Sequence, residues 1–360
     1  MTATELSPAS PSSAANLGPA IQTYGLAKGY KRTQALYPLT LTVPRGAVFA
    51  LVGHNGAGKT TLIKLLMNMI HPSAGTATIL NKDTTTLTGE DFTRIAYASE
   101  NQELPDWMTV GQFLSYLKGF YPTWDDRALV QQLELPLDRK LKHLSRGMLM
   151  KAAIASILAF NPSLILLDEP FSGLDPLVRD ELIEALMSRV NPRSLAANEA
   201  FTAEHAVVSG RSEPDPNRPT ILISSHDLAE VESFATHIGF LHQGHLLFAE
   251  EMHSLTSRFR EVTLTLPPPA PGEAPILLTQ TGTPPESWLL LEKTPTAARF
   301  VHIHADTEPV EAQIASVFPT TVVPTIQIVP MTLRGIFLAL AKSGRTPAVP
   351  TEATKEGKSR

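Results

Sequence analysis

Apolar residues along the chain gather in short runs and in one-sided stripes, which predict strands and helices. Residues 47–52 and 164–167 are apolar throughout, as expected of strands that are buried on both faces of a parallel sheet. Residues 220–224 form a third predicted strand. After the first strand, four apolar residues at helical spacing predict a helix with one buried stripe: Leu62, Leu65, Leu66 and Met69.

The pattern changes toward the C-terminus, where the last hundred residues hold 14 of the 30 prolines. Residues 262–266 and 300–303 alternate in the manner of half-buried strands, and Thr332 precedes a helix whose apolar residues share one face. We therefore expect two domains, one at 20–257 and a small α+β accessory domain at 258–344.

Three segments lack apolar periodicity, and we expect them to lie outside the folded cores. They are a lead-in rich in Ser, Ala and Pro at 1–19, a surface insertion with four prolines at 191–219, and a tail at 345–360.

Composition narrows the class of protein. Apolar residues make up 43% of the chain and charged residues 18%, as in ordinary globular proteins. The longest largely apolar stretch, 152–160, has nine residues, far short of the ~18 to 20 that a membrane-spanning helix requires. The net charge of −5 and a pI of about 6.1 argue against a nucleic-acid partner. The lack of cysteine and of a secretion-signal pattern predicts a cytoplasmic protein.

The strongest chemical signal follows the first predicted strand. Residues 53–61, GHNGAGKTT, satisfy the P-loop pattern, and strand, loop and helix occur in the required order. Glycines let successive N–H groups point at an anion, and the following helix presents its positive end. We expect Lys59 to reach the β- and γ-phosphates and Thr60 to bind Mg²⁺; the alternative is a glycine-rich turn with a chance lysine. The predicted nucleotide-binding residues here are Gly53, Asn55, Gly56, Ala57, Gly58, Lys59, Thr60 and Thr61.

Two carboxylates stand at the end of the second buried strand. Ligands of doubly wound sheets bind at the carboxyl ends of the strands, so Asp168 and Glu169 are candidates for the same site. We expect Asp168 to hold Mg²⁺, directly or through water, and Glu169 to polarise the water that attacks the γ-phosphate. The alternative is an acidic turn after a strand, which the P-loop in the same chain disfavours.

Four further segments distinguish between the classes of P-loop protein. Residues 144–148 (LSRGM), 171–176 (FSGLDP) and 224–227 (SSHD) follow one another along the chain, and Tyr30 precedes the P-loop. Together with the P-loop and the strand-end carboxylates, they resemble the motifs of the ATP-binding subunits of ABC transporters, over roughly residues 20–255.

This resemblance implies a fold and a set of residue roles. The fold is a P-loop NTPase of the ABC ATPase type, with a mostly parallel core sheet, an antiparallel β edge, a helical signature subdomain and here a small β-rich accessory region. Tyr30 would stack on adenine, and His226 would be catalytic together with Glu169 and Lys59. Ser145 and Gly147 would contact the nucleotide of a second copy across the dimer interface, where Asp175 would bridge the two copies.

The sequence departs from the family pattern at two motifs. In the signature, Arg146 replaces the first glycine of a pair and Met148 replaces glutamine. In the segment 95–102, the best register places Glu100 where the family has the glutamine of its Q-loop. A carboxylate can still coordinate Mg²⁺ or its water, so we expect Glu100 to serve as a metal ligand, with Gln102 as the alternative.

The predicted helical subdomain, at about 101–160, concentrates aromatic residues. Thr109 and Gln112 form a capping-box start. The aromatic residues could form the subdomain's own core or a groove for a membrane partner, and both interpretations stay open: Phe113, Tyr116, Phe120, Tyr121 and Trp124. Residues 120–125 and the LSRGM signature are similar to those of ATPases paired with ABC-2 type export permeases.

The function that the resemblance implies is ATP hydrolysis coupled to transport. Two copies would enclose two ATP molecules with Mg²⁺ and drive a separate membrane permease from the inner face of the cell membrane. The similarity to ATPases of ABC-2 type export permeases implies that this transporter is an exporter. One alternative is an ABC-type ATPase that acts on ribosomes or DNA, although the chain has neither the second cassette nor the long coiled coil typical of those classes. Another is a nucleotide sensor without activity, which the intact P-loop and carboxylates disfavour.

Overall fold

The computed structural model describes residues 18–190, 215, 218–268, 276–305, 310–320 and 322–343. The predicted lead-in, insertion and tail lie outside these residues, apart from residues 18, 19, 215, 218 and 219. The chain divides into two compact units, Met1–Ala235 with Leu241–Leu246, and Thr236–Phe240 with Leu247–Arg360.

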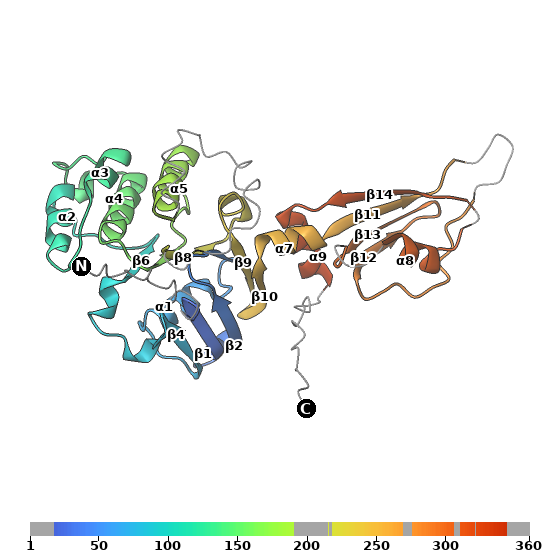
Figure 1. The fold of residues 1–360 in the computed structure, drawn as a ribbon, viewed down its shortest axis with the longest axis horizontal. Helices are drawn as coiled ribbons and strands as arrows, with labels where there is room; N and C mark the ends of the chain where they lie inside the picture. Colours follow the sequence, from blue (N-terminus) through green and yellow to red (C-terminus); the bar gives the residue numbers. More distant parts are fainter. Residues whose placement is uncertain are drawn as a thin grey trace, which may run out of the picture. The chain divides into compact units, whose positions relative to one another are not determined.

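A six-stranded sheet has the strand order β10-β9-β3-β8-β7-β6 (Figure 1). The pairs β3·β8, β8·β7 and β7·β6 are parallel, which confirms the expected mostly parallel core sheet. Its strands β3, β7 and β8 are buried along their whole length. β3 is apolar throughout and β7 except for Asp168, whereas the buried hydroxyls of β8 take part in hydrogen bonds. The strand bounds are β3 Val48–Val52, β6 Ile95–Ser99, β7 Leu164–Asp168, β8 Thr220–Ser225, β9 His237–His242 and β10 His245–Glu251.

A second, antiparallel sheet has the order β2-β1-β4-β5 and corresponds to the expected β edge. Helix α1, Lys59–Leu66, contacts β2 and β4 of this sheet and β7 of the central sheet (Figure 1). The prediction that Met69 continues its buried stripe is wrong, because Asn68 takes a left-handed φ of 54° after the helix has ended, and Met69 is 49% exposed. The strands are β1 Ile21–Tyr30, β2 Thr33–Val43, β4 Ala74–Ile79 and β5 Lys82–Asp83.

Helices α2, α3 and α4 cluster together in the predicted helical subdomain (Figure 1). The capping box is confirmed: Thr109 Oγ1 accepts from Gln112 N at 3.2 Å, and Thr109 N donates to Gln112 Oε1 at 2.9 Å. Besides α1, the described helices of the first unit are α2 Val110–Lys118, α3 Arg127–Gln132, α4 Arg146–Leu158 and α5 Pro176–Val190. Short 3₁₀ turns occupy Thr84–Thr86, Asp91–Thr93, Leu141–His143 and Leu228–Glu230.

The predicted aromatic cluster divides between the two interpretations. Phe113 is buried and Tyr121 stacks on Phe160 with ring centroids 4.0 Å apart, as a subdomain core requires. Tyr116 and Phe120 are more than half exposed and pack edge to face against each other. The core interpretation is therefore confirmed for Phe113 and Tyr121, and a partner groove at Tyr116 and Phe120 stays a prediction.

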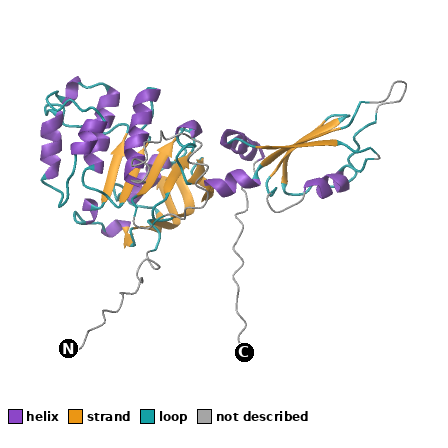
Figure 2. Ribbon diagram, turned by 45° about the horizontal axis from the view of Figure 1, so that its top comes forward, coloured by secondary structure: helices purple, strands orange, loops and turns teal. Residues whose placement is uncertain are grey.

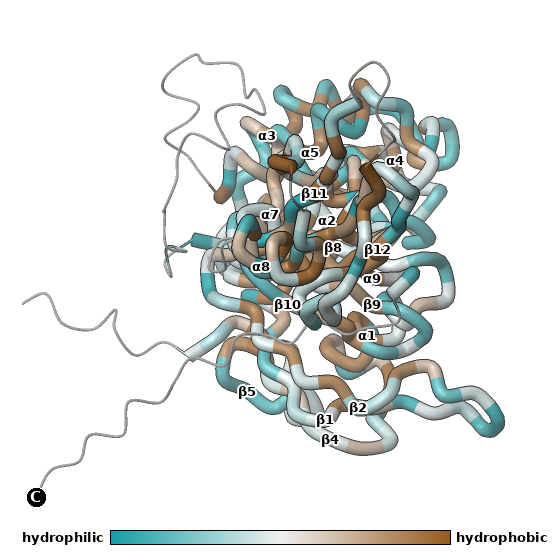
Figure 3. The backbone as a smooth tube through the Cα atoms, turned by 90° about the vertical axis from the view of Figure 1, so that its right-hand side faces the viewer, coloured by the Kyte–Doolittle hydropathy of each residue, from teal (hydrophilic) through white to brown (hydrophobic). Residues whose placement is uncertain are grey.

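Apolar side chains fill the interior of the first unit, where Phe49 and Phe171 are each about 1% exposed. In Figure 3, hydrophobic (brown) and hydrophilic (teal) stretches alternate along the chain. Among the helices that the structure describes, none combines the length and apolar content that a membrane-spanning segment needs.

The second unit is built on an antiparallel sheet in the order β12-β13-β11-β14, with helices beside it (Figure 2). Both strands predicted here are present, as β11 and β13, and each ends one residue earlier than predicted. Trp288 stacks on Phe300 with centroids 3.7 Å apart, and this pair packs with Ile314 and Phe318 in one core. Thr332 caps the last helix by accepting from Gly335 N at 3.2 Å, as predicted. The elements are α7 Met252–Arg258, β11 Arg260–Thr265, β12 Trp288–Lys293, β13 Ala297–His302, α8 Val310–Val317, β14 Thr325–Pro330 and α9 Leu333–Ser343.

Candidate functional site

The P-loop connects β3 to α1, as its sequence predicts. Gly56 and Gly58 have φ of 79° and 108°, in the left-handed region that glycine adopts at little cost. A Cβ on Gly58 would also lie 2.7 Å from the Ala35 carbonyl oxygen. Gly58 is the N-cap of α1, so the loop presents the positive end of that helix together with successive backbone N–H groups. This is the geometry of an anion cradle.

Lys59 is enclosed at the bottom of this loop, with 3% of its side chain exposed. Its Nζ donates to Gly53 O at 2.5 Å and to His54 O at 3.2 Å. It also lies 3.1 Å from Glu169 Oε1. A buried ammonium needs such partners, because removing it from water without them carries a large penalty. The P-loop lysine and the strand-end glutamate are thus in direct contact.

Asp168 ends β7 and is 6% exposed. Its Oδ1 accepts from Thr60 Oγ1 at 3.1 Å and from Ser224 Oγ at 2.8 Å. The sequence predicted Asp168 and Thr60 for the metal site but gave Ser224 no role. The parallel register places Ser224 beside Asp168 on the neighbouring strand β8, so two polar residues at the ends of adjacent apolar runs were the signal that could have identified it.

Glu169 has an unusual backbone with φ of 52°, a conformation that costs an L-residue about 1 to 2 kcal/mol. Its N–H donates to Ser224 Oγ at 3.0 Å, and its Oε2 lies 2.9 Å from His226 Nδ1. An ionised Glu169 carboxylate can only accept, so this contact favours the form of His226 that carries a proton on Nδ1. The other ring nitrogen is then turned away from Glu169 and can face a ligand. The structure therefore brings together the three residues predicted to be catalytic, Lys59, Glu169 and His226.

The donor set at these strand ends suits a nucleotide with Mg²⁺. The Thr60 hydroxyl and the Asp168 carboxylate offer the hard oxygen ligands that Mg²⁺ prefers. The P-loop N–H groups and Lys59 offer the positive charge that phosphates require. Gly53, Asn55, Ala57 and Thr61 lie in or directly after the same loop, in the places that the sequence predicted.

The signature residues lie at the start of α4. Ser145 is the N-cap of this helix and its Oγ accepts from Met148 N at 3.3 Å, which leaves the O–H to donate elsewhere. A Cβ on Gly147 would lie 3.1 Å from Val178 Cγ1, so the start of α4 packs closely on the start of α5. No hydrogen bond recorded among the described residues joins Ser145 or Gly147 to the P-loop of the same chain.

Asp175 precedes α5, and its Oδ1 accepts from Val178 N at 3.1 Å. This residue therefore caps a helix, and its predicted bridging role at a dimer interface stays a prediction. Tyr30 ends β1 in the antiparallel sheet, 46% exposed, with Lys28 Nζ 5.1 Å from the centre of its ring. An exposed ring is compatible with stacking on a base, which also stays a prediction.

Glu100 directly follows β6, and its N–H donates to Asp168 O at 3.0 Å. Its carboxylate forms an ion pair with Arg146, through Oε1 and Nη2. The two departures from the family motifs are thus in contact with each other, which the sequence did not indicate. Glu100, the predicted metal ligand, therefore lies next to Asp168 at the strand ends, as expected. One of its carboxylate oxygens, however, is already paired with Arg146.

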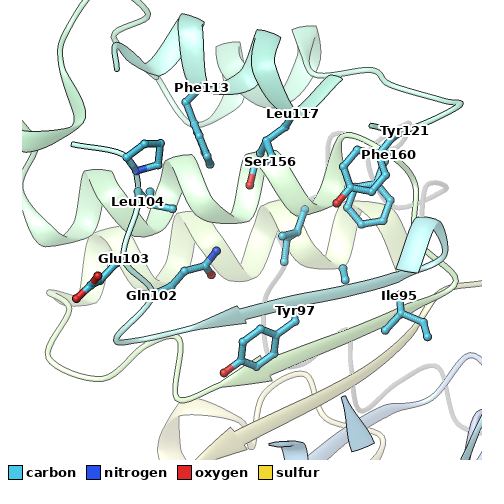
Figure 4. Close-up of a pocket in the computed structure, with 13 residues that line it drawn as sticks. Ile95, Tyr97, Gln102, Glu103, Leu104, Phe113, Leu117, Tyr121, Ser156 and Phe160 are labelled. Carbon is cyan, nitrogen blue, oxygen red and sulfur yellow. The ribbon is translucent and has the colours of Figure 1, made fainter. Parts of the chain in front are cut away.

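Gln102, the alternative, lines a pocket of about 190 Å³ between β6, residues 102–105, α2 and α4 (Figure 4). Phe113 on α2 and Tyr97 on β6 are both among the residues that line this pocket (Figure 4). Burial raises the pKa of the Tyr97 hydroxyl, and the charge of Asp168 adds to that rise. The pocket is smaller than the ~300 Å³ at which small-molecule and cofactor sites begin.

Comparisons with known proteins agree with this geometry. The family model described as ABC transporter matches residues 36–172, and a model for an AAA domain matches 120–232. An ABC transporter ATP-binding protein of Nostoc sp. is 32% identical over 62% of this chain and 62% of its own length. The bacitracin transport ATP-binding protein BcrA of Enterococcus faecalis is 29% identical, over 68% of this chain and 73% of its own length.

Solved structures give the same answer for the fold. The ATP-binding subunit of an ABC transporter matches with a TM-score of 0.55 and 25% identity, over 66% of this chain and 92% of that one. A dimeric ATP-binding cassette bound to ADP and Pi matches with a TM-score of 0.52 and 20% identity, over 64% of this chain and 98% of that one.

The fold and site together define a nucleotide-binding cassette of the P-loop class. The matches make this more specific: residues 36–172 match the family described as ABC transporter, and the chain is similar to ABC transporter ATP-binding proteins. It spans 61% and 62% of the length of two of the curated relatives that it matches.

Proposed function

We propose that this chain is the ATP-hydrolysing subunit of an ABC transporter, which dimerises around two ATP molecules and drives a separate membrane permease. The observation that carries the proposal is the contact of Lys59, Glu169 and His226 at the strand ends, beside the Thr60–Asp168 pair. Each element of phosphoryl transfer has a residue there: a phosphate cradle, a metal-binding pair and a carboxylate that can orient water.

In this proposal, Lys59 and the P-loop N–H groups hold the phosphates, and Thr60 and Asp168 hold Mg²⁺, which would supply charge compensation. Glu100 is the further predicted ligand, through the oxygen that is not paired with Arg146. Glu169 orients the attacking water and accepts its proton, while His226 fixes the carboxylate through Nδ1. Ser224 holds Asp168 and the Glu169 N–H in one arrangement.

The second copy completes the site. Ser145 can cap α4 and donate its O–H at the same time, so its hydroxyl and the α4 N-terminus would contact the γ-phosphate bound by the other copy. Gly147 and Asp175 would lie at the same interface. This arrangement makes activity depend on the dimer, although a single chain would still bind nucleotide.

The permease is the proposed partner of the helical subdomain. The pocket behind Gln102 and the exposed pair of Tyr116 and Phe120 offer apolar contacts for a cytoplasmic segment of such a protein. The names of three relatives specify bacitracin transport, lantibiotic transport and daunorubicin/doxorubicin resistance, which supports an exporter with an ABC-2 type permease. The chain would then work in the cytoplasm, at the inner face of the membrane.

ATP turnover by the purified chain tests the catalytic assignment. We expect Lys59→Ala to abolish ATP binding, whereas Lys64→Ala, an exposed lysine on the same helix, retains it. Glu169→Gln should bind ATP but lose turnover by at least about a hundredfold, whereas exposed Glu184→Gln should not. Normal turnover in Glu169→Gln would contradict the proposal.

Mixing two inactive variants tests the shared site. In a composite dimer, Lys59→Ala and Ser145→Ala damage the same site when they come from opposite copies, so the other site of a mixed dimer is intact. Randomly mixed chains should therefore recover about a quarter of the parent rate, because half of the dimers are mixed and each has one intact site. A mixture that stays inactive, while both variants still dimerise, would show that the sites are not shared.

Co-purification with a co-expressed ABC-2 type permease tests the partner. Replacing both Tyr116 and Phe120 by alanine should weaken retention of the permease at least about tenfold. Leu177→Ala is the matched control, since this residue is 70% exposed but lies at the start of α5. Equal retention of the permease by the parent and the double variant would exclude this surface.

A further inference from the structure

The first residue of α4 and the residue after β6 form an ion pair that the proposed function does not use. Arg146 Nη2 contacts Glu100 Oε1 across 46 residues of sequence. Arg146 directly follows Ser145, and Glu100 donates its backbone N–H to Asp168 O. The pair therefore connects the segment that carries the signature serine to the sheet edge that carries the strand-end carboxylates.

The guanidinium group of Arg146 is also confined by the segment before α5. A Cβ on Gly173 would lie 2.8 Å from Arg146 Nη1 and 3.3 Å from its Cζ, so the guanidinium lies directly against the Gly173 backbone. The φ of Gly173, 66°, favours glycine at this position. Three segments that are far apart in sequence thus meet at one side chain.

We propose that Arg146 is a positioning residue: its ion pair with Glu100 fixes the start of α4 and so directs the Ser145 hydroxyl. The inference rests on the proposed function, in which that hydroxyl contacts the phosphate held by the second copy. The two residues depart from the family motifs with opposite charges, at positions where the family has neutral residues, and the structure brings these two charges into contact. Two residues that form an ion pair must carry opposite charges and must lie in contact, and Arg146 and Glu100 meet both conditions.

The size of the effect follows from exposure. Arg146 is 51% exposed and Glu100 24% exposed, so solvent and salt screen the pair. Measured pairs of this kind shift a local equilibrium by about two- to fivefold. The pair therefore adjusts the orientation of an existing helix start and is not required for folding.

Two amides report directly on the orientation of Ser145. Met148 N–H donates to Ser145 Oγ at 3.3 Å, and Leu149 N–H donates to Ser145 O at 2.9 Å. In the full chain without nucleotide, Glu100→Gln and Arg146→Gln should each speed hydrogen exchange at both amides by about two- to fivefold. The double variant should show no more than either single, because both substitutions break one interaction.

Reversing the pair tests whether charge complementarity matters. Glu100→Lys combined with Arg146→Glu should restore protection at both amides relative to either single reversal. The matched control is Arg299→Gln, which breaks an exposed Arg–Glu pair with Glu261 in the other unit and should leave both amides unchanged. In turnover, each of the Gln variants should lower kcat, and Arg146→Gln should leave the ATP affinity of the isolated chain unchanged.

Three outcomes would overturn the inference. Exchange at the two amides could be unchanged in both single variants. Arg146→Gln could lower turnover while Glu100→Gln does not, which would indicate direct contact of Arg146 with phosphate. Glu100→Gln could raise the Mg²⁺ requirement without changing exchange, which would assign Glu100 to the metal alone. Exchange does not depend on hydrolysis, so retained turnover in Glu169→Gln would remove the proposed function and leave the exchange result standing.

Discussion

Ser224→Ala is the substitution that most directly tests how the strand ends are held together. The Ser224 side chain is fully buried, donates to Asp168 Oδ1 at 2.8 Å and accepts from Glu169 N at 3.0 Å. Alanine removes one hydrogen bond to a charged group and one to a backbone amide. Together these bonds correspond to about 2 to 4 kcal/mol of unfolding free energy. Thr60 still donates to Asp168 in the variant, which favours the lower part of this range.

The assay must follow the first unit by itself, because two units need not unfold together. Hydrogen exchange of the β7 and β8 amides under increasing urea reports the opening of the central sheet. The matched control is Ser156→Ala in α4, a buried serine whose hydroxyl donates only to the Ala153 carbonyl, at 2.7 Å. We expect the control to lose about 1 kcal/mol or less.

Equal losses in Ser224→Ala and Ser156→Ala would refute the reasoning, because the bridge between Asp168 and Glu169 would then contribute nothing beyond an ordinary buried hydroxyl. A loss below about 1 kcal/mol in Ser224→Ala would have the same meaning.

Three further predictions follow from single features. Gly58→Ala should abolish nucleotide binding and lower stability by about 1 to 3 kcal/mol, in a fluorescence titration and a thermal melt, because of its φ of 108° and the nearby Ala35 carbonyl. The bond from Lys82, supported by Thr88, lowers the pKa of Asp91 to about 2, so Lys82→Met should raise that pKa in an NMR titration. Burial lowers the pKa of His237 below its ordinary 6.5. The unfolded chain therefore binds the proton more readily, unfolding free energy falls as pH drops through and below 6.5, and His237→Gln should flatten this dependence.

The sequence was sufficient for the parts of the site that are contiguous. The P-loop, the two carboxylates after β7 and the motif around His226 are each defined by neighbouring residues, so their chemistry is visible without the fold. Strands β3, β7 and β8 of the central sheet were equally predictable, because strands that are buried on both faces contain runs of apolar residues.

Contacts between distant segments were not predictable in this way. Ser224 was noted as part of a motif, but its bond to Asp168 depends on the register of two parallel strands. Glu100 and Arg146 were noted as separate departures, and no local pattern indicates that they touch. Met69 matched the period of α1, but a left-handed Asn68 lies between it and the helix. Periodicity describes a helix only as far as the helix continues.

The contact between Lys59 and Glu169 has a practical consequence for experiments that use a hydrolysis-blocked chain. Replacing Glu169 by glutamine deletes the negative charge that faces an enclosed ammonium, and a phosphate would then meet less competition for that ammonium. Nucleotide affinity measured on the Glu169→Gln variant would therefore be higher than that of the unmodified protein, and its dissociation constant should not be taken as the parent's.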